Sequence, residues 1–292
     1  MLLNDTFGTW FIKMKIFKIQ SVNYTCTNLP MSNKRIPSKI SNRFTELLDV
    51  STYDISQLFF DAPMELEIQQ GNKTIKYYKI NIGSKNKGGV GEFVFNIPFF
   101  CHSFGVEEYT NEQGKATNHS VSLSLVDMNN PSEEQFDLVT SFGKIVDKIK
   151  EHLFTVKKDI KKPTLDKSDL KTFNPMHQSI DEDGNPKGNA WYFSPKLMER
   201  KIYNKEDPSD VQIKIETNFY DEDENEISPL DFVGKKHFKF RGAIKVESIY
   251  IGSKISLQCK IYDGVVRKVT TERKRMTMSK GTNPTDDLLE DE

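Results

Sequence analysis

Cysteine is scarce in this sequence, and its placement argues against both zinc sites and disulfides. The three cysteines, Cys26, Cys101 and Cys259, lie far apart, and no Cys-x-x-Cys pair occurs. A zinc site built from neighbouring cysteines is therefore not expected. An odd number of cysteines in a chain of 292 residues favours reduced thiols in a cytosolic compartment.

Long hydrophobic runs are also missing. No stretch approaches the roughly 20 apolar residues that a membrane-spanning helix needs. The N-terminus lacks a basic first region, and Lys13, Lys15 and Lys18 interrupt its apolar stretch. We therefore expect neither a membrane span nor a signal peptide.

A strong net charge is absent, because 41 basic residues nearly balance 42 acidic ones. This balance excludes a histone-like protein that binds through bulk charge, so a nucleic-acid site must come from local segregation of charge. Such segregation is present: residues 221–226 are acidic, residues 267–280 are mostly basic, and residues 286–292 are acidic again.

Motifs for phosphate and calcium binding are incomplete. The glycines of residues 83–91 do not form a phosphate-binding loop, which needs the pattern G-x-x-x-x-G-K-[ST]. Residues 181–185 begin like a calcium loop, but Pro186 and Tyr192 stand where such a loop has Gly and Glu. We expect no metal and no cofactor.

Cys101 and His102 have the side-chain types of a nucleophile and its base. Adjacent residues point to opposite sides of a strand, and no third member of a triad is evident. A buried cysteine beside a structural histidine is the favoured interpretation. With no other catalytic motif, we expect no enzymatic activity.

The strongest positive pattern lies near the C-terminus. Residues 241–251 and 254–262 alternate apolar and polar side chains around Gly252-Ser253, which predicts a β-hairpin. Residues 235–241 interleave cations with aromatics, a composition that can bind a phosphate chain and stack its bases. Period-2 alternation separates the two kinds of side chain, so we predict that Lys239 and Arg241 face nucleic acid and that Phe238 and Phe240 are core.

The rest of the chain predicts an antiparallel, β-rich α+β fold with one long helix. A capping-box spacing from Ser132 to Gln135 and an apolar stripe predict a helix over about residues 133–156. Strands are expected at residues 10–19, 64–70, 73–82, 92–97 (ended by Pro98), 119–126 and 211–219, a polar loop at 83–91, and a linker at 157–171. We expect an N-terminal strand and loop segment at 1–60, one β-rich nucleic-acid-binding domain at 61–270, and a disordered basic-then-acidic tail at 271–292.

Residues 242–266 resemble the C-terminal block of the single-stranded-DNA-binding protein family of nucleocytoplasmic large DNA viruses. Residues 99–106, the alternating strand and long helix that follow, and residues 194–197 fit the same order. The resemblance spans roughly residues 60 to 270 and leaves the first sixty unmatched. Its motifs are hydrophobic patterns with few invariant chemical groups.

This resemblance implies an OB-type barrel that binds single-stranded DNA without strong sequence preference. It implies a role in protecting or organising DNA during viral replication, in the viral factory of the host cytoplasm and in the virion. The acidic tail resembles those that compete for a basic groove and recruit replication proteins.

The candidate nucleic-acid contacts are the cations of the expected sheet and two aromatics beside them. Trp191 has two interpretations, a core residue or a stacking platform, and residues 267–275 have three, a solvated tail, a nucleic-acid arm or a nuclear-import signal. The candidates are Lys73, Lys76, Tyr78, Lys85, Lys87, Trp191, Lys196, Arg200, Lys201, Lys235, Lys236, Lys239, Arg241, Lys245, Arg267 and Lys268.

A second function remains open: a structural or assembly protein of a large DNA virus virion. The two functions require different side chains on the outward face of the sheet. Exposed Lys and Arg with Tyr and Phe favour nucleic acid, whereas exposed Ile, Leu and Val favour a protein interface.

Overall fold

A computed structural model describes residues 38–269, apart from residues 71–72, 112–113, 128, 204–210 and 235. The strand expected at residues 10–19 and the tail expected at 271–292 lie outside the described residues. Within the described part, no helix combines the length and the apolar character needed to cross a membrane.

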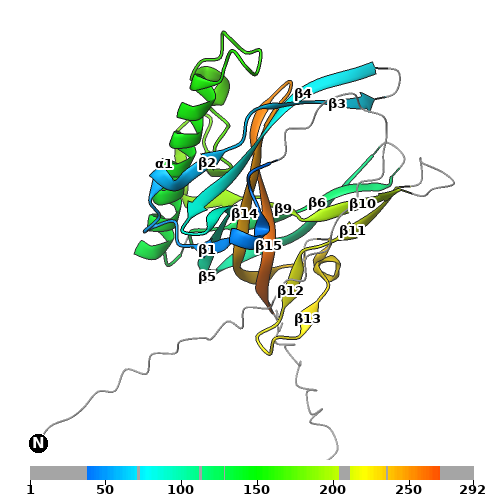
Figure 1. The fold of residues 1–292 in the computed structure, drawn as a ribbon. Helices are drawn as coiled ribbons and strands as arrows, with labels where there is room; N and C mark the ends of the chain where they lie inside the picture. Colours follow the sequence, from blue (N-terminus) through cyan, green and yellow to red (C-terminus); the bar gives the residue numbers. More distant parts are fainter. Residues whose placement is uncertain are drawn as a thin grey trace, which may run out of the picture. The chain divides into compact units, whose positions relative to one another are not determined.

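The core of the fold is a closed barrel (Figure 1). Its five strands neighbour one another in the order β5-β6-β9-β15-β14 and back to β5, and only the β9–β15 pair is parallel. A five-stranded Greek-key barrel of this kind is the core of the OB fold. The barrel strands are β5 (Gly89–Thr110), β6 (Ala116–Ser124), β8 (Pro186–Phe193) continued by β9 (Lys196–Leu197), β14 (Phe238–Ile251) and β15 (Ile255–Lys268).

The remaining strands extend this sheet or form hairpins beside it. β3 pairs with β4 from Met64 and Lys79 to Gln70 and Lys73, and β10 pairs with β11. These strands are β1 (Glu46–Leu48), β2 (Leu58–Phe60), β3 (Met64–Gln70), β4 (Lys73–Asn86), β7 (Met176–Ile180), β10 (Glu199–Tyr203), β11 (Val211–Ile215), β12 (Asn218–Tyr220) and β13 (Glu226–Ile227).

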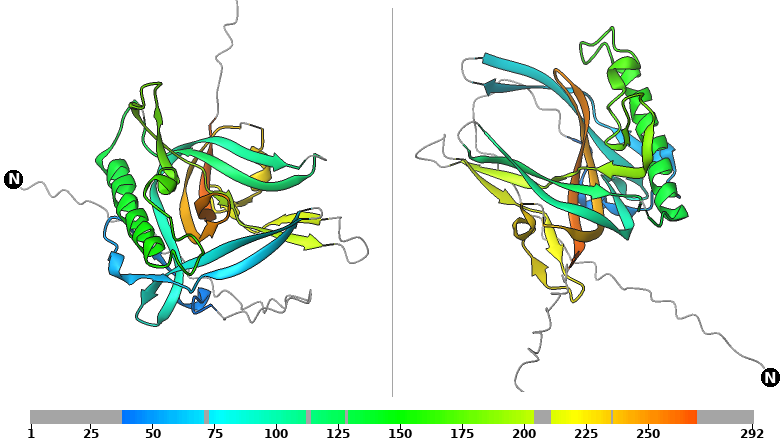
Figure 2. Two further views of the ribbon diagram at one scale, coloured as in Figure 1. Left: turned by 90° about the horizontal axis from the view of Figure 1, so that it is seen from above. Right: turned by 180° about the vertical axis from the view of Figure 1, so that it is seen from behind.

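The long helix α1 (Glu133–Thr155) connects β6 to the next stretch of sheet. Ser132 and Gln135 form the predicted capping box. Phe142 faces the barrel core, 5.2 Å from Phe95 and 6.4 Å from Phe193 between ring centroids. Figure 2 shows α1 along one side of the barrel, away from the tips of the β3–β4 and β10–β11 hairpins. The prediction of an α+β, β-rich fold with one long helix is confirmed.

The C-terminal hairpin and its facing are also confirmed. β14 and β15 pair down to Ile251 and Ile255 around the Gly252-Ser253 turn. Phe238 and Phe240 are fully buried, whereas Lys239 and Arg241 between and beside them are partly exposed. The aromatics of this strand therefore belong to the core and its cations to the outer face.

Two expected strand boundaries are wrong. β5 does not end at Pro98 but continues to Thr110. Its pairing with β14 shifts register between Phe240 and Gly242, and exposed Pro98 lies in this irregular stretch. Because regular pairing is interrupted there, the N–H group that proline lacks is not needed for a hydrogen bond between the strands.

The polar loop expected at residues 83–91 is mostly strand. β4 continues to Asn86, which pairs with Gly89, so only two residues form the turn. Gly91 permits this arrangement, because a Cβ atom there would collide with the backbone of Phe44. A side-chain pattern cannot reveal that close approach.

The linker expected at residues 157–171 is packed against the core. Ile160, Leu165 and Leu170 are buried in it. Their spacing follows turns rather than a regular helix, which is why no periodic pattern marked them. The residues before 61 contribute as well: a compact unit begins at Pro37, and Val50 and Leu58 are buried in its core.

Candidate nucleic-acid interface

One row of side chains crosses the outer face of the barrel. Residues that pair directly across neighbouring strands lie on the same face of a sheet. Lys239 on β14 pairs with Arg267 on β15 and, on its other side, with His102 on β5. His102 also pairs with Ser124 on β6, and Ser124 pairs with Tyr192 on β8. Tyr192 in turn pairs with His177 on β7. We call the outer row this set together with its neighbours Phe100 and Phe104 on β5 and Arg241 on β14: Arg267, Arg241, Lys239, Phe100, His102, Phe104, Ser124, Tyr192 and His177.

One half of the outer row is aromatic. Phe104 lies two residues beyond His102 on β5 and is 37% exposed. Its ring centroid is 5.0 Å from that of His102 and 6.2 Å from that of Tyr192, and His177 adjoins Tyr192 at 6.2 Å. Exposed rings of this kind stack nucleic-acid bases, at about 1–3 kcal/mol per base.

A histidine pair lies beside this aromatic half. His102 Nε2 and His237 Nδ1 are joined by a hydrogen bond of 2.9 Å. Burial, and then the neighbouring His237 and Lys239, lower the pKa of His102. His102 is therefore neutral at neutral pH and presents a flat, uncharged ring.

The other half of the outer row is cationic and is organised around Phe100. The guanidinium carbons of Arg241 and Arg267 lie 4.9 and 4.5 Å from its ring centroid. Such cation–π contacts fix the guanidinium groups without neutralising them. Arg267 is also bound through two nitrogens by Glu222, each contact 2.6 Å long.

Lys239 and Arg241 differ from Arg267, which Glu222 binds. Neither makes an ion pair within the described part of the chain. The hydrogen bond and charge of Arg267, and then the more distant charge of Arg241, lower the pKa of Glu222. Both side chains project from the buried β14 strand at positions fixed by Phe238 and Phe240. They are the cations best placed to contact phosphates.

A hollow of about 280 Å³ lies between the aromatic half and the start of α1. Burial raises the pKa of the Cys101 thiol to about 12, and its Sγ donates to the carbonyl oxygen of Phe240 at 3.2 Å. Cys101 is thus a buried structural cysteine, as predicted, and not a nucleophile. The hollow is lined by Phe100, Cys101, His102, Phe104, Ser124, Asp127, Asn129, Gln135, Tyr192 and Lys239.

Several predicted contact residues are bound to other groups. Lys76 pairs with Glu67 at 3.1 Å, Arg200 with Glu216 at 3.1 Å, and the mostly buried Lys245 with Glu92. Lys236 Nζ donates to the carbonyl oxygen of Asp231 at 2.8 Å. Their charges are therefore partly satisfied within the protein, which sequence spacing could not show.

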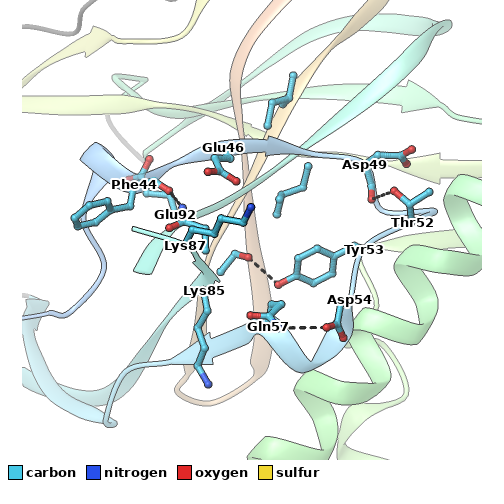
Figure 3. A pocket seen from close by; sticks show the side chains of 14 residues that line it. Phe44, Glu46, Asp49, Thr52, Tyr53, Asp54, Gln57, Lys85, Lys87 and Glu92 are labelled. Atoms are coloured by element: carbon cyan, nitrogen blue, oxygen red, sulfur yellow. Dashed lines mark hydrogen bonds between the residues drawn. The ribbon is translucent and has the colours of Figure 1, made fainter. Parts of the chain in front are cut away.

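Lys85 and Lys87 lie at a different hollow, of about 790 Å³, shown in Figure 3. Four carboxylates share it with them, so the site is net acidic and repels a phosphate chain. The carboxylates are those of Glu46, Asp49, Asp54 and Glu92.

The two predicted aromatics also lie away from the outer row. Trp191 and Tyr78 are half-buried and pack against the core. Trp191 thus takes the first of its two interpretations. Of the adjacent residues Trp191 and Tyr192, Tyr192 is the one whose ring faces outward.

The remaining predicted cations are dispersed. Lys196 pairs with Lys260 of β15. Lys260 precedes Arg267 by seven residues, which places Lys196 roughly 20 Å from Arg267 along the strand. Lys201 is exposed on β10, Lys268 is exposed beside Arg267, and Lys73 begins β4. Lys235 lies outside the described residues.

Sequence reasoning missed the aromatic half of the outer row. Phe100, His102 and Phe104 alternate with the buried Cys101 and Ser103, a period-2 pattern that predicts an outward aromatic stripe. The expected strand end at Pro98 hid that pattern. Nothing local in the sequence places Tyr192 and His177 beside it, because that depends on strand pairing.

No group of three or more His, Cys, Asp or Glu side chains in the described part of the chain is arranged to hold a metal ion. The site therefore consists of rings, cations and a polar hollow. These groups are of the kinds that bind bases and phosphates.

A family model described as "Protein of unknown function (DUF2738)" matches residues 53–289. No curated protein matches the chain. Among solved structures, the chain is similar to the single-stranded DNA-binding protein from bacteriophage Enc34, at 12% identity and a TM-score of 0.33 over 70% of this chain and 95% of that one for a C-terminal truncation. The same phage protein in complex with ssDNA gives 13% identity and a TM-score of 0.32, over 70% and 96%. Likeness at this level does not establish a shared ligand.

Proposed function

The chain belongs to the DUF2738 family of proteins of unknown function, and from its surface we propose that it binds single-stranded DNA without strong sequence preference. The observation that carries this proposal is the outer row. It joins exposed rings to Lys239 and Arg241, which make no ion pair with a described residue, on one face of a barrel.

Single strands suit this surface better than duplexes. Bases of a single strand are free to lie on the rings of Phe104 and Tyr192, while its phosphates reach Lys239 and Arg241. The outer row spans six strands, so five spacings of about 4.8 Å make it roughly 24 Å long. That length suits the lower end of the roughly 4–16 nucleotides bound by one OB fold.

The same proposal includes a biological role. Binding without strong sequence preference suits a protein that protects or organises DNA during viral replication, in the viral factory of the host cytoplasm and in the virion. The sequence resemblance to the large-DNA-virus family supports this part.

A virion structural or assembly protein is the second candidate. Ile68 and Ile75 favour it, because they pair across the β3–β4 hairpin and are 49% and 42% exposed. This apolar pair is small, however, and lies outside the outer row. The larger outward surface carries rings and cations, which favours nucleic acid.

We expect the folded protein to bind a fluorescent single-stranded oligonucleotide, more weakly as salt rises. Each neutralised phosphate should contribute about −0.7 to the slope of log affinity against log salt. Fluorescence anisotropy at several salt concentrations measures both quantities, and a duplex of the same sequence is the control and should bind more weakly. Folded protein that binds no oligonucleotide at low salt contradicts the proposal.

Removing residues 286–292 should tighten DNA binding and leave the melting temperature nearly unchanged. These residues are acidic and follow a basic stretch, so their carboxylates compete with phosphates for Lys239 and Arg241. Anisotropy and thermal melts test this. A tail of equal length with Asn and Gln in place of Asp and Glu is the matched control and should behave like the truncation. Weaker binding, or unfolding, would make the tail structural.

A further inference from the structure

The hollow beside the outer row has a polar wall that neither stacking nor phosphate binding uses. Asp127 forms part of it, after the end of β6 and before α1. Its Oδ1 accepts backbone N–H groups of Asn129 at 2.9 Å and Asn130 at 3.3 Å. The backbone bond from Asn129 first, then the one from Asn130 and the charge of Lys239, hold the pKa of Asp127 below its usual range. The wall therefore carries an ionised carboxylate at neutral pH.

Gln135 lines the same hollow and is oriented by the helix cap. Its Oε1 accepts the backbone N–H groups of Asp127 at 3.0 Å and of Ser132 at 3.2 Å. Because its oxygen is occupied, the amide nitrogen remains as its donor. Asp127 and Gln135 thus place an acceptor and a donor in the lining of the hollow that also contains the rings of His102 and Phe104.

The size of the hollow suits one base. Its volume of about 280 Å³ is enough for one planar base. The rings of Phe104 and Tyr192 line it together, and Lys239 of the cationic half lines it as well. A base leaving the stack of a single strand can therefore enter while its phosphates stay on the cations.

We propose that this hollow binds a single nucleobase and prefers guanine. Oδ2 of Asp127, to which no described residue donates a hydrogen bond, accepts the ring N–H and the exocyclic amino group of guanine, which are adjacent donors. The amide nitrogen of Gln135 donates to the guanine carbonyl oxygen. Thymine is disfavoured, because two carbonyl oxygens flank its ring N–H and repel the carboxylate. This inference rests on the proposed binding of single-stranded DNA and adds a preference at one nucleotide.

Competition among three oligonucleotides of one length tests the inference: all-thymine, thymine with one central guanine, and thymine with one central inosine. Inosine keeps the ring N–H of guanine but lacks its amino group. We expect the guanine oligonucleotide to bind about tenfold more tightly than all-thymine, the size of one good bidentate base contact, with inosine between them.

Asp127→Asn should abolish this order, so that the variant binds the three oligonucleotides with equal affinity. The asparagine oxygen still accepts the two backbone N–H groups, so the loop before α1 is retained. Asp137→Asn is the matched control, because it removes the same charge from an exposed position on α1 outside the hollow; it should keep the guanine preference.

The outcomes separate the two proposals. Equal affinity of the wild-type protein for guanine and thymine oligonucleotides overturns the base pocket and leaves single-stranded DNA binding intact. Equal loss of affinity for all three oligonucleotides in Asp127→Asn also overturns it, because the residue would then be structural. Absence of binding to any oligonucleotide overturns the proposed function itself.

Discussion

Replacing Lys239 and Arg241 together by alanine should weaken single-stranded DNA binding and flatten its salt dependence. Both side chains lie on the outer face and make no ion pair with a described residue. Losing two phosphate contacts should reduce the magnitude of the salt slope by about 1.4, at about 0.7 per phosphate. Anisotropy titrations from low to moderate salt measure this, and thermal melts should show little loss of stability.

Lys85→Ala with Lys87→Ala is the matched control. It removes the same two charges from exposed positions, but these lysines share their hollow with Glu46, Asp49 and other carboxylates. We expect affinity and salt slope to stay near those of the wild-type protein. If this control weakens binding as much as the β14 variant, the DNA path runs over the β4–β5 turn instead of the outer row.

The local parts of the fold followed from the sequence because short-range periodicity determines them. The hairpin around Gly252-Ser253, the inward facing of Phe238 and Phe240 and the capping box of Ser132 each depend on residues within a few positions of one another. Sterics and hydrogen bonding act at that range. The OB-type closure, implied by the resemblance, appears in the strand order of the barrel.

The site was harder to predict, because strand register assembles it. His102 and Lys239 are 137 positions apart, and they pair only because the irregular stretch at Pro98 shifts β5 against β14. A shift of one residue would turn His102 inward and Cys101 outward. Register across six strands is a property of tertiary packing.

It was harder still to predict which individual cations are available to DNA. Lys239 and Lys245 look alike in the sequence, six residues apart on the same outward face of β14. Lys245 is paired with Glu92 and mostly buried, whereas Lys239 has no such partner in the described part of the chain. A mostly buried, paired charge contributes little to long-range attraction of phosphates. Only the neighbouring strand decides which lysine is available to DNA.

Phe240→Ala should destabilise the protein by about 3–5 kcal/mol, the usual cost of emptying a buried aromatic site. Phe240 is fully buried and lies 5.9 Å from Phe219 between ring centroids. Its ring also lies directly over Gly264 of β15, where a Cβ atom would collide with it, so the site is shaped around this side chain. Denaturant unfolding measures the change, with the mid-point falling and the slope unchanged.

Phe104→Ala is the contrasting variant, because it removes an exposed ring of the same type from the outer face. It should leave stability almost unchanged and weaken DNA binding by about 1–3 kcal/mol, the value of one stacked base. The two variants therefore distinguish an aromatic residue of the core from one that stacks on bases. A Phe240→Ala protein that keeps its stability and no longer binds DNA would show that the facing is inverted and that the β14 aromatics are the stacking surface.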